Sequence, residues 1–317
     1  MLPNVDPLRQ LSLERGYFLR REALHFGVDD RQLTLGVRRG GLVRIRQGAY
    51  CHRDVWDCLS VVDRYLARSH AAYDLTTGDV ALSHVSALAD YGCPLWQVGL
   101  KRVHLTRRDG RSSRREAGLV HHRGALPAEE VVNRRDRWVT DPTRSTVDGL
   151  SLMNVESGMV SGDWMLAQGV TDFDRLWTLK TLLNDWPNTR VLEVTLRLLD
   201  GRSQSVGESR LRYLLWWLGF PRPELQYEVR DAAGRLIAVT DMAWPEAGVY
   251  GEFEGKVKYG RLLKPGQDPG EVVFAEKRRE DEVRRATGGT MIRWVWDELH
   301  PTSEPTLQLR QRLKRSA

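Results

Sequence analysis

Cysteine is scarce in this 317-residue chain, which contains only Cys51, Cys58 and Cys93 and no Cys-x-x-Cys pair. An odd number of cysteines without that spacing argues against both a disulfide framework and a zinc ribbon. The chain also lacks any run of about 18 uncharged apolar residues, which argues against a membrane-spanning helix. Its first 22 residues contain no apolar segment of the kind found in secretory signals. These absences predict a soluble protein of the reducing cytoplasm, with no membrane partner.

Lysine is also scarce, with 7 lysines against 41 arginines. Arginine can bind a phosphate through two hydrogen bonds, so this ratio and the net charge of +6 favour a nucleic-acid partner. The codons of a GC-rich genome produce the same excess of arginine, so both explanations stay open. A local basic patch covers residues 101–123, which contain 8 basic and 2 acidic residues. Arg107 and Arg108 in this patch are candidate nucleic-acid contacts.

The remaining composition is that of a folded protein. Hydrophobic residues make up 41% and charged residues 28% of the chain, which is enough apolar content for ordinary cores and argues against disorder over most of the length. The length predicts two or three domains. We place them at residues 1–55, 56–200 and 201–317, and the mixture of helical and strand patterns predicts an α+β or α/β protein.

Residues 6–50 have the pattern of three short helices followed by a hairpin. The helices are expected over 6–15, 19–26 and from about 29 to 39, and the hairpin strands over 42–46 and 49–51. This order is typical of a winged helix-turn-helix. The third helix and the wing would then present arginines to the phosphate backbone of duplex DNA, namely Arg31, Arg38, Arg39, Arg44 and Arg46. The alternative is a small helical module with a solvated arginine face.

Residues 60–200 alternate between helical and strand patterns. Helices are expected over 62–73, over 80–90 with a start near Ser83, and from Thr143, with further helices up to about residue 199. Strands over 103–106 and 119–122 flank a basic loop at 107–116. Four histidines in this region lack the spacing of a metal site and are interpreted as structural, namely His84, His104, His121 and His122.

Several motifs of the first half carry a resemblance to a known family. They are ALSHVSALADYG, RVHLTRR, GLVHHR and VTDPTRSTVDGL, and they follow the predicted winged helix. Together, over roughly residues 6–150, they resemble the antitoxin component of abortive-infection type IV toxin–antitoxin systems, the AbiEi family. The resemblance implies a DNA-binding winged helix, a following α/β domain and a bacterial or phage setting. It implies no catalytic residue.

The C-terminal third begins with a linker, GRSQSVG at residues 201–207. A helix is expected over 208–219, then strands over 225–230, 235–241 and 249–254, a helix over 271–286 and a strand over 290–295. The predicted order of elements is therefore α-β-β-β-α-β.

Acidic residues gather on the predicted strands of this segment. Glu252 and Glu254 lie two positions apart and share one side of their strand, which Lys256 continues. The preceding hairpin should place Asp241 beside Glu252, and Glu208 at the start of the helix is a further candidate ligand. Carboxylates at such a short separation repel one another unless a cation lies between them. Carboxylate oxygens are ligands that suit Mg²⁺ or Mn²⁺. The alternative is a solvated strand face with cross-strand ion pairs.

The order and spacing of these elements resemble the PD-(D/E)XK nuclease superfamily, and within it the Vsr-like branch, over about residues 201–300. The residues that carry the resemblance are Asp241-Met-Ala-Trp-Pro245, Gly251-Glu-Phe-Glu-Gly-Lys256 and Arg293-Trp-Val-Trp296. It implies catalytic roles for Asp241, Glu252, Glu254 and Lys256, and metal binding by Glu208, Asp241 and Glu252. The sequence departs from the motif at the lysine. Either Glu252 is the second acid and Glu254 occupies the lysine position, which the branch tolerates and which we prefer, or Glu254 is the acid and Lys256 the lysine.

Two hypotheses for the function follow. The first is a metal-dependent DNA endonuclease joined to a DNA-binding antitoxin-like region, acting in phage defence or in a toxin–antitoxin-like system, as a monomer or a homodimer. The second is a DNA-binding regulator that keeps the nuclease fold without its activity. Retention of the three acids favours the first hypothesis, and the altered lysine position favours the second. The sequence does not distinguish firmly between DNA and RNA.

Overall fold

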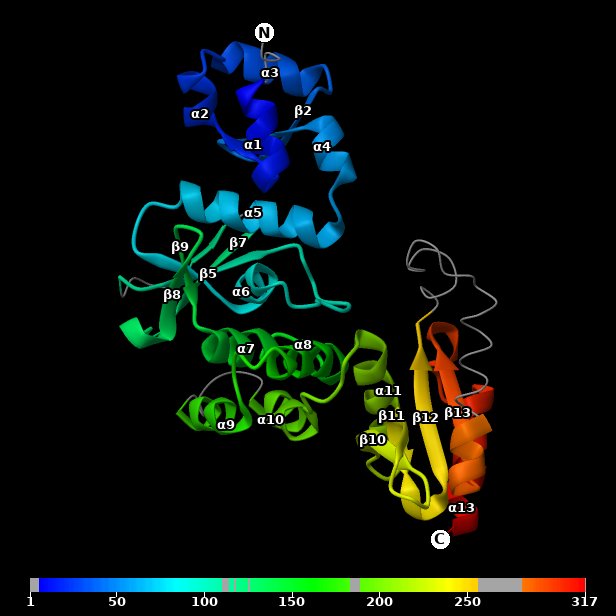
Figure 1. Cartoon of the computed structure of the whole chain (residues 1–317). Coiled ribbons are helices and arrows are strands. Elements are labelled where there is room, and N and C mark those ends of the chain that lie inside the picture. The colour runs from blue at the N-terminus through cyan, green and yellow to red at the C-terminus, as the bar shows by residue number, and fades with distance from the viewer. Residues whose placement is uncertain are drawn as a thin grey trace. The chain divides into compact units, whose positions relative to one another are not determined.

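The computed structural model of the chain describes residues 6–109, 114–116, 118–124, 126–182, 189–255 and 281–316 (Figure 1). It contains helices and three β-sheets, in agreement with the mixed helix-and-strand class expected from the sequence. The chain divides into two compact units. Unit 1 comprises residues 1–161 and 170–193, and unit 2 comprises residues 162–169 and 194–317. No helix in the described ranges is long and apolar enough to cross a membrane.

The first part of unit 1 combines three helices with a small sheet. Its elements are α1 (Pro7–Arg15), β1 (Phe18–Leu19), α2 (Arg20–His25), α3 (Asp30–Arg38), β2 (Leu42–Arg46) and β3 (Ala49–His52). The strands form an antiparallel sheet in the order β1-β3-β2. Asp29 caps α3, since its carboxylate accepts from the Gln32 N–H while the Gln32 side chain accepts from the Asp29 N–H.

The boundaries of the second helix differ from the prediction. Residues 18 and 19 form β1 and pair with Tyr50 and Ala49 of β3, so the helix begins at Arg20 rather than Leu19. Phe18 and Leu19 are completely buried by this pairing. The burial of these two side chains therefore outweighs their compatibility with the helical pattern that follows.

A long helix connects this region with the larger sheet of unit 1. After α4 (Arg53–Cys58), α5 (Val61–Leu75) packs Ala67 and Ala71 against Tyr17, Leu19 and Ala49. At its C-terminal end, Asp74 accepts hydrogen bonds from Arg137 Nη2 (2.8 Å) and Arg137 Nε (2.9 Å). Arg137 lies on strand β9, so an ion pair fixes α5 to the sheet.

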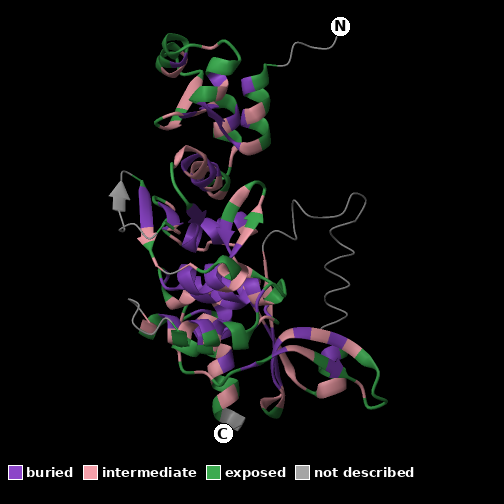
Figure 2. Cartoon of the chain, turned by 90° about the vertical axis from the view of Figure 1, so that its left-hand side faces the viewer, coloured by how far each residue is buried: buried purple, intermediate pink, exposed green. Residues whose placement is uncertain are grey.

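The larger sheet of unit 1 has six strands in the order β6-β7-β5-β4-β9-β8. They are β4 (Val80–Leu82), β5 (Val103–Arg107), β6 (Arg114–Glu116), β7 (Leu119–Arg123), β8 (Val131–Arg134) and β9 (Arg137–Thr140). The accompanying helices are α6 (His84–Tyr91), α7 (Pro142–Leu150) and α9 (Phe173–Leu182), whereas α8 (Val155–Ala167) and α10 (Thr189–Leu198) are divided between the two units. Helices α6 and α7 are buried along almost their whole length, as the purple ribbon in Figure 2 shows.

Two predicted spans in this region are adjusted by the structure. Residues 80–82 form strand β4, because Val80, Ala81 and Leu82 pair with β5 and are buried, and α6 begins at His84, next to the expected start near Ser83. Part of the predicted basic loop is a strand, since Arg114–Glu116 form β6 and pair with β7. Residues 110–113 of that loop lie outside the described residues.

Unit 2 is built around a four-stranded sheet. Its main elements are α11 (Val206–Trp217), β10 (Glu224–Arg230), β11 (Leu236–Trp244), β12 (Val249–Glu254), a helical segment at 281–287, β13 (Thr290–Val295) and α13 (Glu304–Ser316). The strands lie in sequence order, antiparallel except for the parallel pair β12 and β13. The order of elements from α11 to β13 agrees with the expected α-β-β-β-α-β. The N-terminal part of the predicted 271–286 helix, up to residue 280, lies outside the described residues.

One face of this sheet forms the main core of unit 2. Met242, Trp244 and Trp294 pack with Leu211 of α11 and Leu309 of α13. Strand β11 consequently extends to Trp244, three residues beyond the predicted end, because Met242 and Trp244 are buried and residues 242–244 pair with β12. Helix α13 covers the same core and was not predicted.

The first turn of α11 lies directly against strand β12. A Cβ atom added at Gly207 would lie 1.8 Å from the Phe253 ring, so only glycine allows this approach. The contact places Glu208, the next residue of α11, over β11 and β12.

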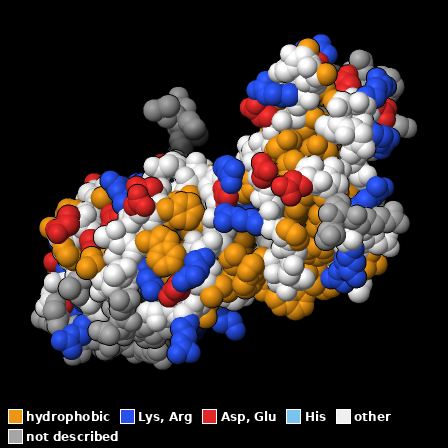
Figure 3. Space-filling model, turned by 90° about the horizontal axis from the view of Figure 1, so that it is seen from below, with side chains coloured by type: hydrophobic (Ala, Val, Ile, Leu, Met, Phe, Trp, Pro, Cys, Tyr) orange, Lys and Arg blue, Asp and Glu red, His pale blue; other side chains and the backbone are white. Residues whose placement is uncertain are grey.

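Tryptophans of unit 2 are divided between core and surface. Trp294 is fully buried, whereas Trp216 and Trp217 of α11 are 42% and 60% exposed. Trp216 and Trp217 are therefore surface residues, whereas Trp294 belongs to the core. Figure 3 shows hydrophobic side chains among Lys and Arg side chains on the face of the molecule seen from below.

Candidate functional site

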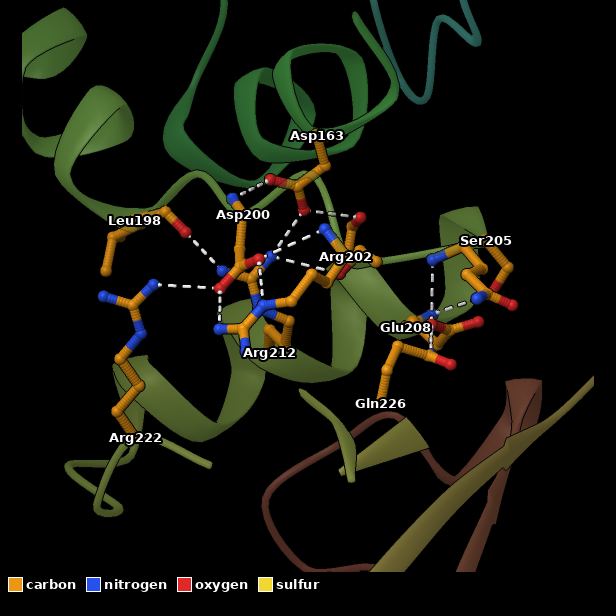
Figure 4. Close-up of polar contacts among 12 residues, drawn as sticks. Asp163, Leu198, Asp200, Arg202, Ser205, Glu208, Arg212, Arg222 and Gln226 are labelled. Carbon is orange, nitrogen blue, oxygen red and sulfur yellow. Dashed lines mark hydrogen bonds and ion pairs between the residues drawn. The ribbon is translucent and has the colours of Figure 1, made fainter. Parts of the chain in front are cut away.

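The first candidate ligand, Glu208, is held in the first turn of α11. Ser205 caps this helix by accepting from the Glu208 N–H (3.2 Å). The Glu208 carboxylate turns back toward the start of the helix, where Oε2 accepts from the Gln204 N–H (2.9 Å) and from Gln226 Nε2 (3.5 Å). Figure 4 shows Glu208 with Ser205 and Gln226. Glu208 is 7% exposed, so its carboxylate is buried. The hydrogen bonds to its Oε2 come from neutral donors, the Gln204 N–H and the Gln226 amide.

The second candidate, Asp241, lies within β11 and faces β12. The register pairs Met242 with Gly251, and one further step in the same register brings Asp241 opposite Glu252. The backbone hydrogen bonding between β11 and β12 is interrupted here, since the Phe253 N–H donates to the side-chain oxygen Asp241 Oδ2 (2.8 Å). The Asp241 side chain therefore lies at the point where the two strands begin to separate.

Glu208 and Asp241 influence each other electrostatically. The pKa of the Glu208 carboxyl lies above its usual value, mainly because of burial, and the negative charge of Asp241 raises it further. The hydrogen bond from the Gln204 N–H acts in the opposite direction. The buried carboxylate of Glu208 and the half-buried one of Asp241 repel each other, and a cation between them would relieve the repulsion.

The two glutamates of β12 have different surroundings. Glu252 Oε2 lies 3.5 Å from Arg293 Nε on the neighbouring strand β13. Glu254 Oε1 is buried and has no hydrogen-bond partner among the described residues. A buried carboxylate oxygen without a partner is unfavourable, so Glu254 fits the role of a cation ligand better than Glu252 does.

Within the described ranges, no three His, Cys, Asp or Glu side chains meet at the spacing that a metal ion requires. Asp241 is engaged by the Phe253 N–H and Glu252 by Arg293, so the predicted ligands Glu208, Asp241 and Glu252 are not assembled as a ready cluster. The fourth predicted catalytic residue, Lys256, lies outside the described residues.

An ion-pair network that the sequence did not reveal fixes α11 in unit 2. Asp163 Oδ2 accepts from Ser209 Oγ (2.7 Å) and Arg212 Nη1 (2.6 Å), and Asp163 Oδ1 accepts from the Asp200 N–H (2.7 Å). Figure 4 shows Asp163 above α11 with Asp200 and Arg212. Because Ser209 follows Glu208, this network helps to fix the backbone from which the Glu208 side chain extends. The partners are more than thirty residues apart in sequence, and no local pattern links them.

The arginines predicted to contact DNA on α3 and β2 lie at the surface. Arg31, Arg38, Arg39 and Arg44 are exposed, and within the described part of the chain none of the four side chains makes a hydrogen bond or an ion pair. Arg46 is half-buried. The nearby acids are occupied, since Asp30 pairs with Arg20 and Asp29 caps α3. This surface therefore carries uncompensated positive charge.

The two arginines predicted in the basic patch are paired instead. Arg107 binds both carboxylate oxygens of Asp109, at 2.8 and 2.5 Å. Arg108 lies 3.3 Å from Asp79 and stacks over the Trp138 ring at 5.1 Å. Their charges are compensated within the chain, so they are weaker candidates for phosphate contacts than the arginines of α3 and β2.

Three of the four histidines interpreted as structural from the sequence, His84, His104 and His122, form a stack. The rings of His84 and His122 lie 3.7 Å apart, and His104 Nδ1 lies 2.9 Å from His122 Nε2. Burial and the neighbouring His122 lower the pKa of His104 to about 3. These histidines therefore pack as neutral rings and have structural partners.

No protein-family model matches the chain. It is similar to two proteins of Mycobacterium tuberculosis, the uncharacterized protein MT2308 of strain CDC 1551 / Oshkosh and the uncharacterized protein Rv2248 of strain ATCC 25618 / H37Rv. Each is 24% identical over 267 residues, which covers 78% of this chain and 92% of the relative. Because it covers 78% of the chain, the similarity includes residues of both units.

Proposed function

We propose that the chain is a metal-dependent nuclease in which unit 2 cleaves a phosphodiester bond and the N-terminal part of unit 1 holds duplex DNA. The observation that carries the proposal is the group of acids where α11 meets β11 and β12. Glu208 and Asp241 repel each other there, and Glu254 presents a buried oxygen without a partner in the described part of the chain. The resemblance to Vsr-like PD-(D/E)XK nucleases supports the same assignment.

Mg²⁺ or Mn²⁺ at this position would polarise a phosphate oxygen and lower the pKa of an attacking water. Asp241 and Glu208 would hold the cation, with one of the two glutamates of β12 as a further ligand. Of these two, Glu254 has the oxygen without a partner among the described residues, whereas Glu252 is paired with Arg293. We therefore favour Glu254 as the second acid and Lys256 as the lysine of the motif, which reverses the preference drawn from the sequence. Lys256 would then orient the water or stabilise charge in the transition state.

The experiment is a cleavage assay on supercoiled plasmid with the full-length chain in Mg²⁺, in Mn²⁺ and in excess EDTA. We expect nicked or linear product with either metal and none in EDTA. Single-stranded DNA and a structured RNA of similar length are assayed in parallel, because the acids act on the phosphate and do not by themselves select DNA. Equal cleavage in EDTA contradicts the metal site, and cleavage of RNA alone contradicts the DNA assignment.

The DNA-binding part of the proposal rests on residues 6–52. Their order of elements, α1-β1-α2-α3-β2-β3, supports a winged helix-turn-helix, in which α3 would enter the major groove. The exposed arginines of α3 and β2 would contact phosphates on either side. The resemblance to the AbiEi family supports this assignment and a role in phage defence or a toxin–antitoxin-like system.

Replacing both Arg38 and Arg39 by alanine should weaken duplex binding and its dependence on salt. Each phosphate contact contributes about 0.9 to the slope of log affinity against log salt, so the double variant should lose about 1.8. The measurement is fluorescence anisotropy with a labelled duplex over a range of salt concentrations.

The matched control replaces Arg9 and Arg53 by alanine. This removes the same charge from the same region, but these arginines pair with Asp54 and Asp57. We expect a smaller change in slope. An unchanged slope for the Arg38 and Arg39 variant would show that α3 is not the DNA-binding element, and the basic patch at 107–115 would become the next candidate.

The second candidate function is a DNA-binding regulator with an inactive nuclease-like unit. The pairing of Glu252 with Arg293 and the lack of a ready ligand cluster in the described ranges favour it. It predicts duplex binding with an arginine-dependent salt slope and no cleavage with any divalent metal. The two assays above therefore separate the candidates.

A further inference from the structure

Gln226 of β10 has a backbone conformation that is unfavourable for its residue type. Its φ is +52°, in the left-handed region, where a side chain with a Cβ atom is strained and glycine is not. Among the described residues of unit 2, it is the one non-glycine residue with positive φ. Such strain persists only where the surrounding structure imposes it.

The strained residue lies at the candidate site. The register pairs Leu225 with Met242 and Tyr227 with Thr240, so Gln226 lies between these pairs, opposite Asp241. Its side chain reaches α11, where Nε2 lies 3.5 Å from Glu208 Oε2. Figure 4 shows Gln226 directed toward Glu208. Gln226 thus lies opposite Asp241 in the sheet and within hydrogen-bond distance of Glu208.

The kink at Gln226 has a structural purpose that glycine would serve better. Leu225 and Met242 belong to the core beneath α11, whereas Val229 and Ala238 pack in the cluster that contains Val283. The strand therefore changes face between residues 225 and 229, and a left-handed residue permits the change. If the kink were the whole requirement, glycine would meet it without strain, so the glutamine side chain has a use of its own.

We infer that Gln226 is a positioning residue of the divalent-cation site, and this inference rests on the proposed function. Its amide N–H donates to Glu208 Oε2 and fixes that carboxylate on the side of β10 and β11, beside Asp241. The amide is neutral, so its hydrogen bond to Glu208 leaves the negative charge of the site available to the cation. A lysine or arginine at this position would neutralise the carboxylate instead.

The test compares Gln226→Gly with Gln97→Gly in the full-length chain. Gln97 is a matched control, because it is an exposed glutamine with φ +50° in unit 1, which contains none of the residues of the candidate site. Both substitutions relieve left-handed strain, so each should raise the melting temperature of its own unit in EDTA by about 2–5 °C. The second readout is Mn²⁺ affinity, measured by calorimetry and by the shift in melting temperature.

We expect Gln97→Gly to bind Mn²⁺ like the wild type. Gln226→Gly should bind it about 10-fold or more weakly, which is the usual effect of removing a side chain that orients a metal ligand. Gln226→Asn, which keeps an amide and tolerates positive φ, should fall between the two.

The outcomes separate this inference from the proposed function. Wild-type affinity in Gln226→Gly overturns the inference and leaves the metal site in place. A Gln226→Gly variant that melts lower than the wild type in EDTA also overturns it, because the glutamine would then be retained for stability. Failure of the wild type itself to bind Mn²⁺ overturns the proposed metal site and the inference together.

Discussion

Asp241→Asn should reduce metal-dependent cleavage by about 100-fold or more while the protein remains folded. A metal ion supplies several kcal/mol of charge stabilisation in the transition state, and each loss of about 1.4 kcal/mol costs a factor of ten in rate. The variant keeps an oxygen in place of Oδ2, which can still accept from the Phe253 N–H. Removal of the negative charge beside Glu208 also relieves repulsion, so the melting temperature in EDTA should stay the same or rise.

The measurements are the rate of plasmid nicking in saturating Mg²⁺ and the melting temperature in EDTA. Glu246→Gln is the matched control, because it removes one negative charge from the exposed turn between β11 and β12. It should cleave at the wild-type rate. If Asp241→Asn retains that rate as well, Asp241 is not a metal ligand.

The same assay decides between the two glutamates of β12. If Glu254 is the second acid, Glu254→Gln should be as inactive as Asp241→Asn, and Lys256→Ala should be severely impaired. If Glu252 is the acid and Glu254 occupies the lysine position, Glu252→Gln should be inactive and Lys256→Ala should have a smaller effect. The second pattern would restore the interpretation drawn from the sequence alone.

The strands and helices of unit 2 were largely predictable because their signals are local. The expected strands over 249–254 and 290–295 agree with β12 and β13, which begin directly after Gly248 and Gly289. The misplaced boundaries have tertiary causes. Strand β11 is longer than predicted because its last residues pair with β12, and β1 replaces the start of a helix because Phe18 and Leu19 pair with β3.

The surroundings of the site residues could not be read from the sequence. Pairing of strands made it possible to place Asp241 beside β12, but not to foresee that Arg293 would engage Glu252 or that Arg107 and Arg108 would pair with Asp109 and Asp79. Left-handed backbone at Gln226 has no sequence signal, since glutamine is not a residue that favours it. The partner of each charged side chain depends on three-dimensional packing. The number of charged residues in a sequence does not indicate which of them pair.

Asp163→Ala should destabilise unit 2 by about 3–5 kcal/mol, the usual cost of removing one partner from a buried ion pair. The side chains of Asp163 and Arg212 are 1% and 6% exposed. Without the aspartate, the Ser209 hydroxyl loses its acceptor away from water, and the Arg212 guanidinium loses this carboxylate while keeping Ser203 Oγ and the Leu198 carbonyl. The measurement is urea unfolding of the full-length chain, followed by a probe in unit 2. Arg202→Met is the control, because Arg202 is largely exposed and its pair with Asp200 should contribute no more than about 1 kcal/mol.

Replacement of both partners should behave differently from replacement of one. Burial raises the pKa of Asp163 to about 6 even with Arg212 beside it, so the ionised aspartate costs more free energy in the folded chain than in the unfolded one. An apolar pair of similar volume avoids that cost, and we expect Asp163→Leu with Arg212→Met to recover most of the stability lost in Asp163→Ala. The recovered variant should still cleave poorly, because Ser209 would no longer be held and Glu208, its neighbour on α11, would lose its fixed position. A double variant as unstable as the single one would show that the hydrogen bonds of Asp163 to Ser209 and the Asp200 N–H, rather than its charge, hold α11 in place.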